Sequence, residues 1–118
     1  MMYRTLAFAG LVSLFSGCNG TKEESPEELA FQRDWAAGWC DRQAECAQAD
    51  YDSQWQDNEE CIDNKSTDAE FNSAFGDILC GDFDAGNTQA CLDAMDDADC
   101  ADWSNNEWRN ECGLVYGC

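Results

Sequence analysis

Apolar residues recur at helical spacing in several segments of this chain, while the alternation typical of β-strands is missing. Between residues 27 and 47, one side of a helix would carry Phe31, Trp35, Trp39 and Cys46, opposite Asp34, Asp41 and Glu45. The same spacing returns in the residues after Thr67 and after Thr88. We therefore predict an all-α domain of about four to five helices, near residues 26–48, 54–64, 68–79, 88–98 and 105–112.

Helix-start signals agree with this pattern. A capping box places Ser or Thr three residues before Glu or Gln, so that two backbone N–H groups are satisfied reciprocally. Four pairs fit: Ser25 with Glu28, Ser53 with Gln56, Thr67 with Glu70, and Ser104 with Glu107. Pro26 suits the first helical position, and Trp103 and Trp108 are placed to meet as a hydrophobic staple beside the last box. Gly81 and Gly113 are the expected left-handed helix ends.

The first residues have the composition of a leader. Arg4 precedes an apolar stretch over residues 6–15, and Ser16 and Gly17 lead directly to Cys18. The stretch is far shorter than the roughly 20 residues that a membrane-spanning helix needs. We predict a signal peptide over residues 1–17, a lipidated N-terminus and tether over 18–25, and a cysteine-rich helical domain over 26–118.

The segment from Phe15 to Cys18 resembles the lipobox of bacterial lipoproteins. The resemblance implies that Cys18 is acylated and holds the mature protein on a membrane. Asn19 replaces the Asp that often retains lipoproteins at the inner membrane, so we expect an outer-membrane lipoprotein facing the periplasm or the cell surface. The alternative is a plain secretory leader in which Cys18 is incidental.

Eight of the nine cysteines remain once Cys18 is set aside. The sequence has no histidine and no Cys-x-x-Cys spacing, which disfavours zinc, iron–sulfur and thioredoxin-like sites. An exported protein meets an oxidising compartment, so we predict four disulfides. Their pairing stays open, because eight cysteines allow roughly a hundred connectivities. These cysteines are Cys40, Cys46, Cys61, Cys80, Cys91, Cys100, Cys112 and Cys118.

Charge narrows the possible partners. The chain has 25 acidic and 6 basic residues, a net charge of −19, and removal of the leader with Arg4 makes the mature net charge −20. Such a chain repels nucleic acids and anionic lipid surfaces, so we predict no nucleic-acid partner. Besides the membrane that holds its lipid, the expected partner is a protein with a basic patch. The disulfides would offset the self-repulsion of the folded domain.

Catalytic motifs are absent from the sequence. The usual hydrolase triad needs a histidine, and among 25 acids a suitably spaced carboxylate pair has no specificity. We therefore predict that the protein is not an enzyme and needs no cofactor. Calcium binding is the alternative function, with Asp82 and Asp84 at the first and third loop positions and Asp93 at the twelfth. In the competing interpretation, Asp84 or Asn87 simply caps the next helix.

Among the five tryptophans, Trp55 is the candidate for an exposed contact, because it lies within the polar run 53–60. The other four, Trp35, Trp39, Trp103 and Trp108, fit the predicted core. The run from Phe83-Asp84 through Cys91-Leu92-Asp93-Ala94-Met95 to Cys100, with Cys112 beyond it, resembles small uncharacterised cysteine-rich lipoproteins of myxobacteria. That resemblance strengthens fold and location only. We predict a structural or protein-interaction module of the cell envelope, with a low-affinity cation-binding module as the alternative.

Overall fold

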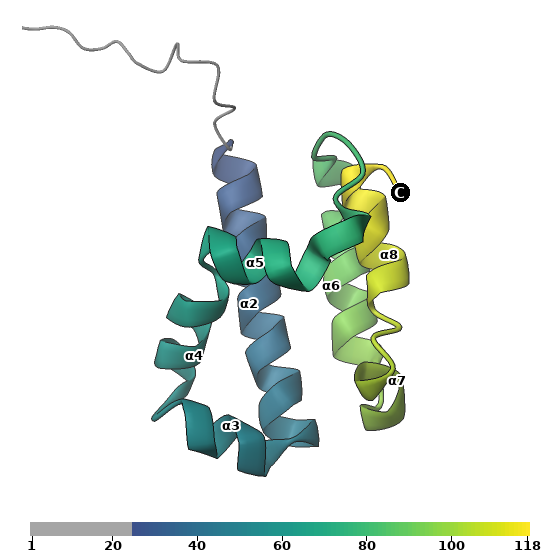
Figure 1. The fold of residues 1–118 in the computed structure, drawn as a ribbon. Helices are drawn as coiled ribbons and strands as arrows, with labels where there is room; N and C mark the ends of the chain where they lie inside the picture. The colour runs from purple at the N-terminus through teal and green to yellow at the C-terminus, as the bar shows by residue number, and fades with distance from the viewer. Residues whose placement is uncertain (1–24) are drawn as a thin grey trace, which may run out of the picture.

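The computed structural model describes residues 25–118, and this part of the chain is all-α (Figure 1). The prediction of an all-α fold is confirmed, with more and shorter helices than expected. The predicted leader, its predicted cleavage site and Cys18 lie outside the described residues. The α-helices are α2 (Pro26–Cys46), α3 (Gln48–Gln54), α4 (Asn58–Lys65), α5 (Asp68–Phe75), α6 (Thr88–Asp97), α7 (Cys100–Ser104) and α8 (Arg109–Gly113). Three 3₁₀ turns accompany them: η3 (Gly76–Ile78), η4 (Ala85–Asn87) and, after α8, η5 (Leu114–Tyr116).

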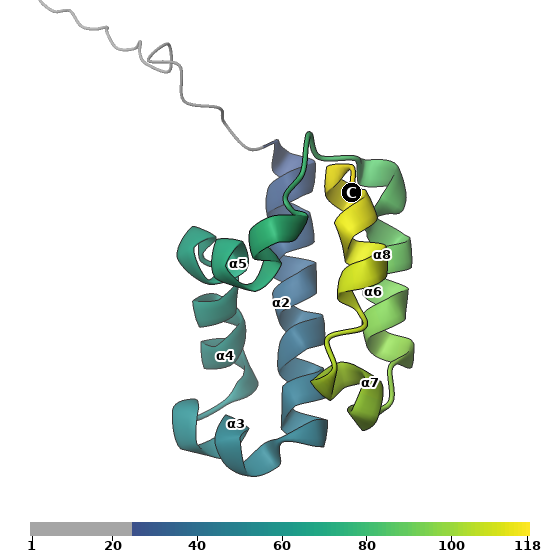
Figure 2. The same cartoon turned by 45° about the vertical axis from the view of Figure 1, so that its right-hand side comes forward.

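Helix α2 is the axis of the domain. It contacts α3 and α4 on one side and α6 and α7 on the other, and α8 packs against α6. Figures 1 and 2 show α4, α6 and α8 running roughly along α2, while α3 crosses below the end of α2 and α5 lies across the bundle nearer its start. In the part of the chain that the structure describes, no helix is both long and apolar enough to cross a membrane.

Two of the four predicted capping boxes begin helices. Ser25 caps α2, accepting a hydrogen bond from the Glu28 N–H at 3.1 Å, with Pro26 as the first helical residue. Thr67 caps α5 by accepting a hydrogen bond from the Glu70 N–H at 3.3 Å. A side-chain oxygen at the N-cap satisfies a backbone donor that has no partner within the helix. Both predicted helix starts are confirmed, although the glutamates bind Tyr116 and Lys65.

The other two boxes are wrong. Ser53 lies inside α3, and α4 begins after Asp57, which accepts from the Glu60 N–H at 2.8 Å. Aspartate caps a helix as well as serine does, so a search restricted to Ser and Thr misplaces this start. Ser104 is the last residue of α7, and the helix that follows, α8, begins at Arg109 without a side-chain cap.

The predicted left-handed glycines are also wrong. Gly113 ends α8 with φ −62°, and Gly81 is not among the glycines with positive φ. The left-handed turn lies four residues later, at Gly117, where φ is 81°. The chain continues from α8 directly into η5, so the turn is needed only after that extra helical turn.

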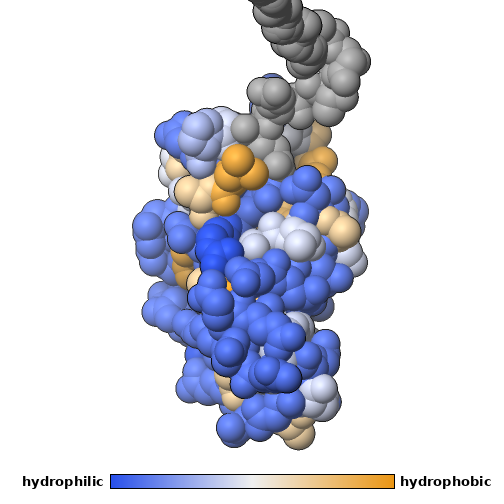
Figure 3. Space-filling model, turned by 90° about the vertical axis from the view of Figure 1, so that its left-hand side faces the viewer, coloured by the Kyte–Doolittle hydropathy of each residue, from blue (hydrophilic) through white to orange (hydrophobic). Residues whose placement is uncertain are grey.

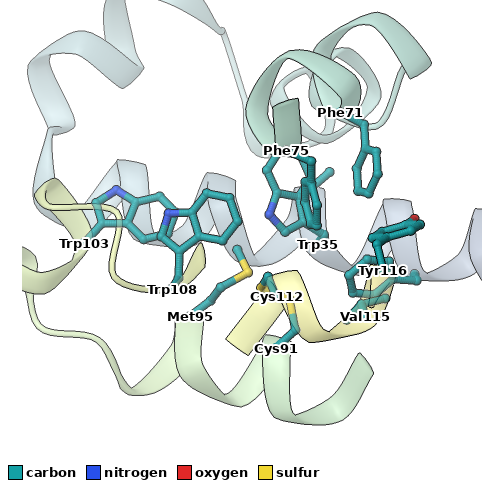
Figure 4. Packing of buried hydrophobic residues seen from close by; sticks show 12 residues of the cluster. Trp35, Phe71, Phe75, Cys91, Met95, Trp103, Trp108, Cys112, Val115 and Tyr116 are labelled. Carbon is teal, nitrogen blue, oxygen red and sulfur yellow. A yellow bond between two sulfur atoms is a disulfide. The ribbon is translucent and has the colours of Figure 1, made fainter. Parts of the chain in front are cut away.

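The main core is aromatic and surrounds Trp35, which is fully buried (Figure 4). Its ring lies 5.4 Å from Phe71, 5.5 Å from Phe75 and 5.9 Å from Trp108 between centroids. Trp103 stacks on Trp108 at 6.1 Å, so these two rings meet as predicted. They do not form a helix staple, because residues 105–108 form turns.

A second, smaller core contains Trp55, and the prediction that this residue is exposed is wrong. Only 8% of Trp55 is exposed, and its ring lies 5.8 Å from Trp39 and 5.6 Å from Tyr51. The backbone is extended at Trp55, between α3 and α4, and the side chain packs in the cluster beside α2. The Lys65 ammonium lies 4.2 Å from the centre of the Trp39 ring. The polar neighbours of Trp55 along the chain therefore conceal a core position.

All eight cysteines of the described domain are paired, which confirms the four predicted disulfides. The structure adds their connectivity: Cys40–Cys61, Cys46–Cys100, Cys80–Cys118 and Cys91–Cys112. The first two join α2 to α4 and to α7, and the last joins α6 to α8. Each typically contributes about 2–4 kcal/mol by restricting the unfolded chain, so together they fix both flanks of the bundle.

Candidate functional site

A hollow of about 690 Å³ lies beside the start of α2. We call it the end pocket. Its walls come from the first two turns of α2, from α5, from the segment 79–85 and from η5. The side chains that matter for its chemistry are Glu27, Glu28, Phe71, Asp82, Phe83, Asp84 and Tyr116.

Three aromatic rings form the apolar part of the end pocket. Phe71 and Tyr116 are almost fully buried, whereas Phe83 is half-buried. The Phe83 ring lies 5.8 Å from that of Tyr116, and Phe71 lies 6.2 Å from Tyr116. The Tyr116 hydroxyl donates a hydrogen bond to Glu28 Oε2 at 2.9 Å. An aromatic wall is thus joined directly to a carboxylate.

The segment that carries Asp82, Phe83 and Asp84 is fixed to the end of the chain. The Gly81 N–H donates to the Tyr116 carbonyl, and the Asp84 N–H donates to the Val115 carbonyl at 2.7 Å. The Cys80–Cys118 disulfide closes the same junction covalently. The pocket wall is therefore preorganised, which lowers the entropic cost of binding a ligand.

The three candidate calcium ligands do not form one site. Asp82 and Asp84 line the end pocket, whereas Asp93 lines a hollow between α2 and α6 that neither of them lines. Within residues 25–118, no group of three or more acidic, cysteine or histidine side chains is arranged to hold a metal ion. Asp84 instead caps η4, accepting from the Gly86 N–H at 2.9 Å and from Asn87 Nδ2 at 3.0 Å. The competing prediction is confirmed only in part, because Asp84 caps the 3₁₀ turn η4, whereas α6 begins after Asn87 without a side-chain cap.

A groove follows the seam between α2 and α6. It consists of two adjoining hollows of about 300 Å³ each, which share Asp34, Gln89 and Leu92. Its upper part also shares Glu27, Phe83 and Ala85 with the end pocket, so the two depressions are continuous. We call it the α2–α6 groove; it is lined by Glu27, Ala30, Phe31, Asp34, Gly38, Asp41, Arg42, Phe83, Ala85, Thr88, Gln89, Leu92, Asp93 and Asp96.

Every basic side chain in residues 25–118 is bound to an acid of the same domain. Arg33 pairs with Glu59 and Asp63, Arg42 with Glu45, Lys65 with Glu70, and Arg109 with Asp77. Arg42 also donates to the Ala98 carbonyl at 2.6 Å, and Arg109 to the Phe75 carbonyl at 2.8 Å. The hydrogen bond from Arg109 lowers the pKa of Asp77.

The remaining acids have no basic counterpart. The described residues hold 23 acids and 4 bases, so most carboxylates face solvent uncompensated. The face of the molecule in Figure 3 is accordingly dominated by hydrophilic residues, with a few hydrophobic ones at its upper end. The field around the end pocket and the groove is negative, which attracts cations.

Sequence reasoning missed the end pocket. Phe83 and Tyr116 are 33 residues apart, and neither belongs to an amphipathic helix that would show in the spacing. One signal in the sequence is the pair Gly113 and Gly117, which flank residues 114–116 and indicate a turn that contains Tyr116.

No family model, curated protein or solved structure matches this chain. Its function is therefore inferred from the chemistry of the end pocket, the groove and the charged surface. Together these features place aromatic ring surface beside carboxylates that have no basic partner.

Proposed function

We propose that this protein is a membrane-anchored acidic lipoprotein of the cell envelope that binds proteins through segments rich in lysine or arginine. The observation that carries the proposal is the commitment of all four described basic side chains to internal ion pairs. The surplus carboxylates around the end pocket and the groove are left to attract a partner. Complementary charge mainly raises the encounter rate and selects against acidic partners.

The end pocket suits the head of a lysine or arginine side chain. The alkyl stem of such a side chain packs on apolar surface, and its charged head interacts with ring faces and carboxylates. Phe83 and Tyr116 provide ring surface, while Glu27 and Asp82 provide carboxylates at the rim. A neutral or acidic side chain would gain only part of this interaction.

Acylation of Cys18 would keep this pocket close to the membrane. Seven residues separate Cys18 from the start of α2, and a fully extended chain of that length reaches roughly 25 Å. The end pocket adjoins the first turn of α2. A partner would therefore meet the protein near the membrane surface.

Binding is tested with the full chain carrying Cys18→Ser, so that a water-soluble protein can be titrated. We expect a fluorescently labelled lysine-rich peptide to bind at 20 mM NaCl and to lose at least tenfold in affinity at 300 mM NaCl. A glutamate-rich peptide of the same length is the control. Equal binding of the two peptides, or no binding of the lysine-rich one, would refute the proposed partner class.

Anchoring is tested separately by cell fractionation. The wild-type protein should sediment with membranes, and Cys18→Ser should move it to the soluble fraction. Replacement of Cys18 does not touch the eight paired cysteines of the domain. A soluble wild-type protein would support a plain secretory leader instead.

A further inference from the structure

Acidic residues recur at a regular spacing along the α2 side of the α2–α6 groove. Glu27, Asp34 and Asp41 follow one another at seven-residue intervals on α2, and all three are exposed and line the groove. Seven residues of α-helix are two turns, or about 10.5 Å of rise. The three carboxylates therefore form a row about 21 Å long on one face of α2.

Apolar and small residues lie inside this row. Ala30 and Gly38 occupy α2 between the acids, and the partly exposed Leu92 and Phe83 face them from α6 and from the segment before η4. Met95 lies only 3.3 Å from the position that a Cβ atom on Gly38 would occupy, so α2 and α6 approach closely there. The upper half of the groove thus has an apolar floor and an acidic border, whereas charged and polar residues line most of its lower half.

The second border belongs to α6 and is also acidic. Asp93 and Asp96 line the groove, and Arg42, the one base beside it, already bonds Glu45 and the Ala98 carbonyl. On the opposite flank of α2, in contrast, Arg33 pairs with Glu59 and Asp63 of α4. Only the α6 flank of α2 therefore combines an apolar floor with acids that have no basic partner.

We propose that the α2–α6 groove binds an amphipathic helix of a partner protein that carries lysine or arginine about every seven residues. The seven-residue acid repeat fits a second helix laid along α2, since helices packed along one another match side chains at this period. Apolar side chains of that helix would cover Ala30 and Leu92, and its cations would meet Asp34 and Asp96. This inference rests on the proposed function and adds that the partner's basic segment binds as a helix.

The test uses the full chain with Cys18→Ser and a 14-residue lysine–leucine peptide with lysine at helical spacing. Asp34→Asn/Asp96→Asn removes two groove charges, and neither side chain makes a hydrogen bond or ion pair in the domain. Asp50→Asn/Asp52→Asn removes two exposed charges from α3 as the matched control. We expect the groove variant to raise Kd at least tenfold and the control less than twofold.

A second pair of variants tests the apolar floor. Ala30→Lys places a long cationic side chain in the groove, whereas Ala49→Lys makes the same change on an exposed position of α3. We expect the first to abolish measurable binding and the second to weaken it less than threefold. Far-ultraviolet circular dichroism should show the same helicity in all variants.

The outcomes separate the groove from the general function. If the wild-type protein fails to bind the peptide at low salt, the proposed function fails. If it binds, but the groove and control variants weaken binding equally, the proposed function is supported. The groove is then rejected as the binding site, and the peptide is held by the negative charge of the whole surface. Equal binding of a scrambled peptide of the same composition, without helical periodicity, would overturn the helical form of the ligand.

Discussion

The Tyr116 hydroxyl donates a hydrogen bond to Glu28 Oε2 at 2.9 Å, joining residues 88 positions apart in the sequence. The bond ties η5 to the first turn of α2 at the edge of the end pocket. Tyr116→Phe keeps the buried ring and removes only the donor, so we expect the free energy of unfolding to fall by about 1–2 kcal/mol. Urea unfolding followed by tryptophan fluorescence measures it, and an unchanged midpoint would show that the bond contributes nothing.

The Cys46–Cys100 disulfide spans 54 residues, the longest separation of the four. Restricting a loop of that length removes more entropy from the unfolded chain than the 21-residue Cys40–Cys61 bridge does. Cys46→Ala/Cys100→Ala should therefore cost about 4 kcal/mol in free energy of unfolding. Denaturant unfolding under non-reducing conditions tests this expectation, which a cost below about 1 kcal/mol would contradict.

Trp55 is a core residue of the smaller cluster, and its removal should affect stability and not binding. Trp55→Ala leaves a cavity beside Trp39 and Tyr51, with an expected cost of about 3 kcal/mol. The exposed neighbour Gln54 provides the control, since Gln54→Ala should change stability by less than about 0.5 kcal/mol. Peptide affinity below the unfolding transition should equal that of the wild-type protein; a selective loss of affinity in Trp55→Ala would reinstate it as a contact residue.

Tyr51 should make the domain sensitive to alkaline pH. Burial raises the pKa of its hydroxyl, and the neighbouring carboxylates of Asp57, Asp41 and Asp52 raise it further. The folded state then holds this proton more tightly than the unfolded chain, whose tyrosine titrates at about 10. Its stabilising contribution is complete below that pH and is lost as pH rises toward the folded-state pKa.

The measurement is the free energy of unfolding at several pH values between 8 and 11, for the wild type and Tyr51→Phe. The wild type should lose more stability over this range, because phenylalanine has no proton to release. At pH 8 the variant should be the less stable of the two, because it lacks the 2.8 Å hydrogen bond from the Tyr51 hydroxyl to Asn58 Oδ1. Parallel pH profiles of the two proteins would contradict the predicted role of Tyr51.

Helices with both a broad apolar face and a side-chain cap could be predicted from the sequence. Helix α2 begins at Pro26 as expected and ends two residues early, and α5 begins after Thr67. Local spacing and capping chemistry suffice there, because both signals lie within a few turns of one another.

The region between residues 48 and 65 could not be predicted in this way. Its two short helices meet at Trp55, which is buried against Trp39 of α2, while Cys61 is joined to Cys40. These contacts are distant in sequence and leave no periodic trace in a polar segment. The end pocket escapes prediction for the same reason, since Phe83 and Tyr116 meet only in the folded chain.

The disulfide connectivity has a consequence for fragmentation of the domain. A protease that cuts after lysine or arginine has four target residues within residues 25–118: Arg33, Arg42, Lys65 and Arg109. After all four cuts, every fragment from residue 34 onward would still be covalently joined. Cys40–Cys61 holds 34–42 to 43–65, and Cys46–Cys100 holds 43–65 to 66–109. Cys80–Cys118 and Cys91–Cys112 both hold 66–109 to 110–118. Residues 34–118 would migrate as one species on a gel until a reducing agent released the pieces.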